Sequence, residues 1–242
     1  MTARKLAAEF LGTALLLVAV VGSGITASTD GAASAQLFYH AVVVGVALVA
    51  LIVTFGHVSG GHFNPAVTAV DAIFGGMSLS LAVRYVAVQL AGGVVGVVAT
   101  NVMFSRPAVT IAATERTGLA LAGSEALATF GLLVVIFGVV RSGNVRAVPG
   151  AVGAYIGAAI YFTSSASFAN PAVTVARALS DTYTGIAPGG VGGFIAAQAA
   201  GTVLAAALIG WLFAPDPSDA AQVVVPHDPP EMATVGDRQG QH

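Results

Sequence analysis

The sequence Asn-Pro-Ala-Val-Thr occurs twice in this chain, at residues 64–68 and again at residues 170–174. Each copy opens a short apolar stretch, near residues 64–76 and 170–180. Each stretch is too short to cross a bilayer, because a spanning helix needs about 20 residues. Asn followed by Pro is typical of a helix start, with Asn as the cap and Pro in the first turn. The sequence therefore predicts two short helices, each beginning at its Asn-Pro pair.

The chain as a whole has the composition of a membrane protein. Of its 242 residues, 56% are hydrophobic and 8% are charged, whereas an ordinary soluble domain has about 25% charged residues. Such a chain cannot cover its surface with polar groups, so a soluble fold is excluded. We predict an all-α membrane protein with spans at roughly 6–25, 37–56, 80–104, 119–140, 148–165 and 188–213.

Composition also excludes several kinds of chemistry. The chain has no Cys, and its formal net charge is -2. Thiolate metal sites and cysteine nucleophiles are therefore excluded, and no basic surface is expected for nucleic acid. His57 and His62 have no further ligand residues beside them, so we predict no metal and no cofactor.

The two halves of the chain align with each other as a repeat. The stretch at residues 8–18 matches residues 124–134, and the doubled motif matches in all five positions. Because the first span copies an internal span, we do not interpret it as a cleaved signal. Each repeat, about 5–105 and about 118–213, holds three spans, so the second enters from the opposite side. The short helices should then meet near the bilayer midplane.

Glycine spacing predicts where the spans pack closely. The chain has 30 glycines, and small residues let membrane helices approach each other. The pairs that we expect at such contacts are Gly92/Gly96, Gly153/Gly157 and Gly189/Gly193.

Orientation follows from the basic residues between the spans. Lys and Arg in loops favour the cytoplasmic side. One side carries Arg4, Lys5, Arg84, Arg141, Arg146 and Arg238, and the other carries Arg106, Arg116 and Arg177. We therefore predict that both termini are cytoplasmic. The Pro-rich residues 214–242 are predicted to form a disordered cytoplasmic tail.

The starts of the short helices suit a pore for neutral solutes. Asn64 and Asn170 can each point an amide donor at a water or alcohol oxygen. A helix start carries partial positive charge, which repels cations. The loops before the motifs would line the pore with carbonyl groups, because irregular backbone at membrane depth persists only against protein or water.

These features resemble the aquaporins, the major intrinsic protein family. The likeness rests on residues 8–13 and 56–68 and on the second motif, and it covers about residues 5–213. It implies six tilted helices, two re-entrant half-helices, one pore per chain, a homotetramer in the cell membrane, passive conduction and no enzyme activity. The motif residues at the pore would be Asn64, Pro65, Ala66, Asn170, Pro171 and Ala172.

Two carboxylates lie within predicted spans, Glu9 and Glu125. An ionisable residue there is a functional hypothesis by default, and a proton-coupled secondary transporter is the alternative function that they would serve. The resemblance favours a different role, in which each carboxylate braces the re-entrant loop of its own repeat. His57 and His62 are also expected to brace a loop.

The resemblance also marks a departure at the selectivity filter. Typical aquaporins carry Arg directly after the second motif, where this chain has Val173. Ungapped family spacing places the other three filter positions at Val44, Ala158 and Ser167, with Gly157 as the alternative to Ala158. A filter without Arg should be wide. It resembles that of bacterial aquaglyceroporins associated with arsenic resistance, and glycerol, urea and uncharged arsenite are the expected solutes.

Two further charges lie at matching positions, Asp71 and Arg177, seven residues after each motif Asn. They could form an acidic inner and a basic outer vestibule, with Arg177 partly replacing the missing filter Arg. They could instead be solvated charges at the mouths, with Arg177 paired to Asp181. An anion channel using Arg177 is a third possibility, and the sequence leaves these open.

Overall fold

The computed structural model describes residues 2–29 and 32–213, and within these ranges all of the regular secondary structure is helical. Six segments are long and apolar enough to span a membrane, which confirms the predicted spans and fold class. They contain α1 (Thr2–Ala27), α2 (Ala33–Ser59), α4 (Leu79–Met103), α5 (Leu119–Arg141), α6 (Val148–Phe162, after the 3-10 turn η1 at Val145–Ala147) and α8 (Pro188–Leu212). The predicted tail at 214–242 lies outside the described residues.

Two short helices lie among the six spans, α3 (Pro65–Ile73) and α7 (Pro171–Arg177). At 1.5 Å per residue they are about 13 Å and 10 Å long, less than half of a bilayer core of about 30 Å. The structure thus confirms two short helices at the doubled motif, each with Pro in its first turn. Both end earlier than the apolar stretches in the sequence suggest.

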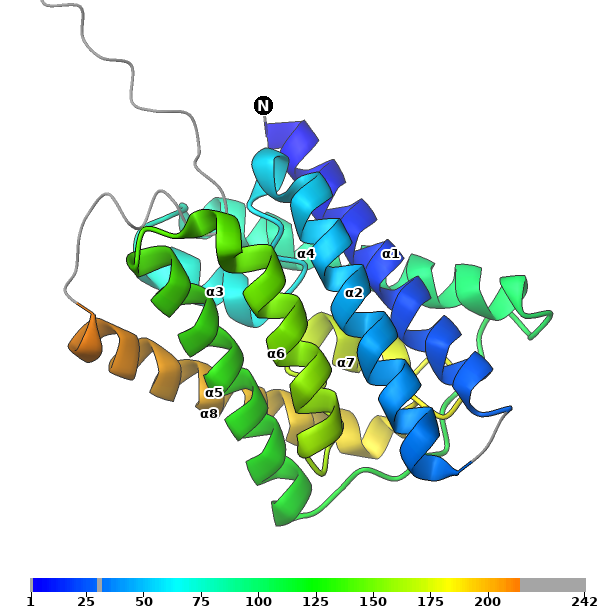
Figure 1. The fold of residues 1–242 in the computed structure, drawn as a ribbon. Coiled ribbons are helices and arrows are strands. Elements are labelled where there is room, and N and C mark those ends of the chain that lie inside the picture. Colours follow the sequence, from blue (N-terminus) through cyan, green and yellow to red (C-terminus); the bar gives the residue numbers. More distant parts are fainter. Residues whose placement is uncertain (1, 30–31, 214–242) are drawn as a thin grey trace, which may run out of the picture.

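The packing repeats between the two halves of the chain. α1 packs against α2 and α4, and in the same way α5 packs against α6 and α8. Figure 1 shows α1 and α5 running in opposite directions across the bundle, as an inverted repeat requires. The short helices cross between the repeats, because α3 contacts α8 and α7 contacts α4.

Glycine permits the closest helix contacts. A Cβ added at Gly92 in α4 would lie 2.3 Å from the carbonyl oxygen of Phe10 in α1. At the matching position in the second repeat, a Cβ on Gly201 would lie 2.3 Å from the carbonyl oxygen of Ala126. The prediction for Gly189 and Gly193 is wrong, because neither has a heavy atom within 4 Å of an added Cβ. Both lie near the start of α8 and are exposed.

These contacts predict a difference between two glycines of α8. Gly201→Ala should force α5 and α8 apart and lower the free energy of unfolding by about 1–3 kcal/mol, the usual cost of overpacking. Gly193→Ala is the matched control and should be neutral or slightly stabilising, since Ala is the better helix former. Thermal unfolding of the purified protein in detergent compares them. Equal midpoints for the two variants would contradict the packing.

Candidate functional site

The two half-helices are joined at their starts by reciprocal hydrogen bonds. The side-chain nitrogen of Asn64 donates to the carbonyl oxygen of Ala169 at 2.8 Å, and that of Asn170 donates to the carbonyl oxygen of Phe63 at 2.8 Å. Phe63 and Ala169 each precede a motif and have positive φ angles of 48° and 47°. This backbone turn directs each carbonyl toward the other repeat, so each loop is fixed by the Asn of its counterpart.

The motif asparagines also cap their own helices. The side-chain oxygen of Asn64 accepts the backbone N–H of Ala66 at 2.8 Å, and that of Asn170 accepts those of Ala172 and Val173 at 2.9 and 3.2 Å. These bonds fix which end of each amide is oxygen and which is nitrogen. An amide nitrogen has two hydrogens, and the reciprocal bond uses one. One donor per Asn therefore remains for the space that both residues line.

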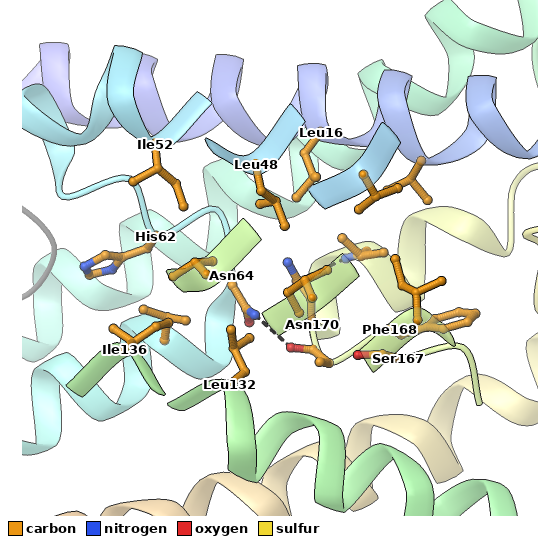
Figure 2. Close-up of a pocket in the computed structure, with 18 of the residues that line it drawn as sticks. Leu16, Leu48, Ile52, His62, Asn64, Leu132, Ile136, Ser167, Phe168 and Asn170 are labelled. Carbon is orange, nitrogen blue, oxygen red and sulfur yellow. Dashed lines mark hydrogen bonds between the residues drawn. The ribbon is translucent and has the colours of Figure 1, made fainter. Parts of the chain in front are cut away.

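A cavity of about 60 Å³ runs past the two asparagines. A water needs about 10–15 Å³ by this measure, so the cavity suits a short file of waters. Figure 2 shows His62, Ile52 and Ile136 at one end, which we call the His62 end, and Ser167 and Phe168 at the other, the Phe168 end. Most of the wall is aliphatic, including Leu16, Val20, Val44, Leu48, Ile52, Val67, Leu132, Ile136, Val152, Ile156, Ile160 and Val173.

Glu9 in α1 holds the loop before the first motif. One carboxylate oxygen accepts the backbone N–H of His62 at 2.9 Å and the hydroxyl of Ser59 at 2.7 Å. The other accepts the backbone N–H of Phe63 at 2.7 Å and the amide of Gln89 at 2.8 Å. Each oxygen thus accepts one loop N–H and one side-chain donor from a neighbouring helix.

Glu125 in α5 has the same arrangement in the second repeat. Its carboxylate accepts the backbone N–H groups of Phe168 and Ala169 at 2.8 and 2.9 Å, and the amide of Gln198 at 2.8 Å. Both glutamates are fully buried, and neither is among the residues lining the cavity. A carboxylate that is turned away from the solute path and saturated with donors does not suit a coupling-ion site. The geometry is the one that bracing requires.

The two histidines of the first loop have different environments. His62 lines the cavity, and its Nδ1 lies 3.1 Å from the hydroxyl of Thr68. His57 lies in the last turn of α2, is exposed, and makes no hydrogen bond with another described residue. The prediction that His57 braces the loop is therefore wrong. Its side chain is exposed, whereas Ser59, two residues later and so on another side of the helix, donates to Glu9.

Asp71 is buried rather than solvated at a mouth. Only 1% of its surface is exposed, and one of its carboxylate oxygens lies 3.7 Å from Nε2 of His62. Neither oxygen has a hydrogen-bond partner among the described residues, and Asp71 is not part of the cavity wall. The expectations of an acidic vestibule charge and of a solvated charge at a mouth are therefore both wrong for Asp71, because it is buried and does not line the cavity.

Arg177 is likewise buried, with 3% of its surface exposed. Its Nε donates to the carbonyl oxygen of Thr184, and its guanidinium carbon lies 3.3 Å from the centre of the Phe168 ring. Asp181 instead accepts the backbone N–H of Ala113 at 3.0 Å. The expected solvated pair of Arg177 with Asp181 is therefore wrong, and Arg177 forms part of the cavity wall.

Three of the four predicted filter residues line the cavity: Val44, Ser167 and Val173. Ala158 does not. It is exposed and lies with Gly157 in a separate groove between the outer faces of α2 and α6. Ile156 and Ile160 of α6 line the cavity instead, because residues four apart share one helix face and Ala158, two from each, lies opposite. Ungapped family spacing therefore ends on the wrong face of α6.

Sequence reasoning missed one polar residue of the cavity, His40. It is buried, lines the cavity from α2, and its Nδ1 lies 2.7 Å from the hydroxyl of Ser23. A signal for it exists in the sequence, since His40 lies four residues before Val44 and so shares its helix face.

Comparison with known proteins agrees with this geometry. The family model described as "Major intrinsic protein" matches residues 1–166. Aquaglyceroporin AqpS of Rhizobium meliloti (strain 1021) is 42% identical over 231 residues, which are 95% of this chain and 97% of that protein. Aquaporin NIP1-1 of Zea mays is 34% identical over 196 residues, 76% of this chain and 67% of that one.

A solved structure has the same fold. The aquaglyceroporin of Plasmodium falciparum superposes with a TM-score of 0.66 at 20% identity, covering 86% of this chain and 95% of that chain. These relatives support neither the transporter nor the anion-channel alternative. The chain belongs to the major intrinsic protein family, the aquaporins, whose members are membrane channels for water and small neutral solutes and not enzymes.

Proposed function

We propose that this channel passes neutral solutes larger than water, with glycerol, urea and uncharged arsenite as the candidates. One observation carries the proposal: the cavity wall directly after the second motif is Val173, with Val44 also in the wall. A valine offers no donor and is shorter than the Arg that typical relatives carry there. Water therefore loses an ordering contact, and bulkier solutes gain room.

The aliphatic wall supports passage of neutral solutes and exclusion of ions. An ion must give up its hydration shell to enter a narrow apolar passage, which costs far more than moving a neutral hydroxyl. The two Asn amide donors lie midway along the wall and can replace part of the hydration of an oxygen-bearing solute. They cannot coordinate a cation. The bacterial relative at 42% identity bears the name aquaglyceroporin, which agrees with the proposed solutes.

Assembly and placement are also proposals. We infer a homotetramer in the cell membrane with both termini cytoplasmic, so that the His62 end of the cavity opens to the cytoplasm. The excess of basic residues on the side that holds Arg4 and Lys5 supports the orientation. Native mass measurement of the purified protein and accessibility of an N-terminal tag in sealed cells test the two parts.

The side-chain amides of Asn64 and Asn170 are predicted to be required for conduction. Asn64→Asp or Asn170→Asp loses the amide hydrogens, so the bond to the opposite carbonyl is replaced by repulsion between two oxygens. Solute flux per channel should fall at least about tenfold, because a misplaced loop obstructs the passage. Stopped-flow swelling of proteoliposomes measures it. Asn144→Asp, the same change at an exposed site, should conduct normally. Normal flux in both motif variants would exclude this role.

Substitution of the buried glutamates distinguishes loop bracing from proton coupling. Glu9→Gln or Glu125→Gln replaces one acceptor oxygen with an NH2 group. That group is itself a donor, so it cannot accept the N–H bond that the carboxylate oxygen accepted. Stability should fall by about 1–3 kcal/mol, with less folded protein but unchanged flux per folded channel. Glu115→Gln, at an exposed loop position, is the control for charge removal. Normal yield with flux that has lost a wild-type dependence on pH would favour the proton-coupled role instead.

The side chain at position 173 is predicted to determine which solutes pass. Val173→Arg should reduce glycerol and urea flux more than water flux, because a long side chain narrows the wall. Val173→Met is the matched control, since it adds length without charge or donors. If both variants exclude glycerol equally, width decides selection, and if only Arg does, its donors decide it. A wild type that conducts water but neither glycerol nor urea would refute the proposed solute range.

A further inference from the structure

Two polar side chains of the cavity wall lie one helical turn beyond two of the apolar filter positions. His40 precedes Val44 by four residues in α2, and Arg177 follows Val173 by four residues in α7. Four residues are slightly more than one turn of helix, or a shift of about 6 Å along its axis. Both shifts lead away from the motif asparagines, toward the Phe168 end. Both side chains line the same cavity and are at least 97% buried.

Arg177 is held in a fixed position with donors to spare. Its Nε donates to the carbonyl oxygen of Thr184, and its guanidinium carbon lies over the Phe168 ring, 3.3 Å from the ring centre. The Nε bond is its only hydrogen bond with another described residue. The four hydrogens on its two terminal nitrogens are therefore available to a solute. A guanidinium against a ring is pre-organised, so little conformational entropy is lost when a solute binds.

His40 is held from two sides and leaves one nitrogen toward the cavity. Nδ1 lies 2.7 Å from the Ser23 hydroxyl, and the ring packs edge-on against Tyr183 with centres 6.4 Å apart. Nε2 has no hydrogen-bond partner among the described residues. An imidazole fixed through one nitrogen offers the other to a solute oxygen or hydroxyl.

The segment that holds Arg177 also fixes a second arginine away from the cavity. Arg116 donates to the carbonyl oxygens of Gly185 and Tyr183 at 2.8 and 3.2 Å, and its guanidinium carbon lies 5.3 Å from the Phe168 ring centre. Arg116 is not among the cavity-lining residues. The chain thus has two arginines against one ring, of which only Arg177 faces the solute path.

We propose that His40 and Arg177 form the solute-selecting constriction of this channel, displaced one helical turn from Val44 and Val173 toward the Phe168 end. This proposal rests on the proposed function, and it assigns solute selection to two residues outside the four predicted filter positions. The ligand class is a small neutral molecule with at least two oxygen or nitrogen groups, one bonded by Arg177 and one by His40. Its carbon face passes Phe168 and then enters an apolar section at Val44 and Val173.

The test measures permeabilities of water, glycerol and the larger erythritol in proteoliposomes with equal amounts of folded protein. The variants are Arg177→Met, His40→Ala and, as the matched control, Arg116→Met. Arg177→Met and His40→Ala should each raise the erythritol-to-glycerol permeability ratio about tenfold, the scale of one or two substrate contacts. Arg116→Met should leave the ratio unchanged even if its yield falls.

Each outcome decides between the two proposals. If Arg177→Met does not fold, the ratio for His40→Ala decides alone. The displaced constriction is overturned if the erythritol-to-glycerol ratio is unchanged in the folded Arg177→Met and His40→Ala variants, or if it rises equally in Arg116→Met. In either case, glycerol flux through the wild type still upholds the proposed function. If the wild type carries water alone, the proposed solutes are overturned. The constriction is then tested separately: it is upheld if Arg177→Met or His40→Ala gains glycerol flux, and it is overturned if neither variant does. A wild type that carries none of the three solutes overturns both.

Discussion

The structure depends on satisfying backbone polar groups in two non-helical loops at membrane depth. No lipid can bond those groups, so every partner must come from protein or from solute in the pore. The reciprocal bonds between Asn64 and Ala169 and between Asn170 and Phe63 meet this need at the centre. Because each loop is completed by the opposite motif, neither half-helix is positioned without the other. This mutual dependence explains why the motif occurs twice.

The buried carboxylates extend the same network outward. Glu9 and Glu125 each bond two successive loop N–H groups directly before a motif, and Gln89 and Gln198 fix the carboxylates from α4 and α8. The loops are thus held from behind as well as across the pore. A wall held in this way keeps a constant width, which a size-selective passage requires.

The sequence predicts the fold and the centre of the site because both follow from spacing and repetition. Span lengths, the doubled motif and the matching Glu positions all have counterparts in the structure. Residues whose roles depend on helix rotation are less predictable. Ungapped family spacing reaches Ala158 on the outer face of α6, whereas Ile156 and Ile160 line the cavity. His57 and Asp71 fail for a similar reason, since sequence proximity to a loop does not determine which way a side chain leaves its helix.

The loss of Arg at position 173 does not remove the guanidinium from the pore. α7 ends at Arg177, and Phe168 and Thr184 hold its side chain in the cavity wall. A guanidinium near the Phe168 end still opposes cation entry, because in a narrow apolar passage its charge is poorly screened. A polar entrance and an apolar section beyond it then act in sequence. The first selects by hydrogen bonding, and the second offers no donors of its own, so a solute that passes the entrance meets no second site that would hold it.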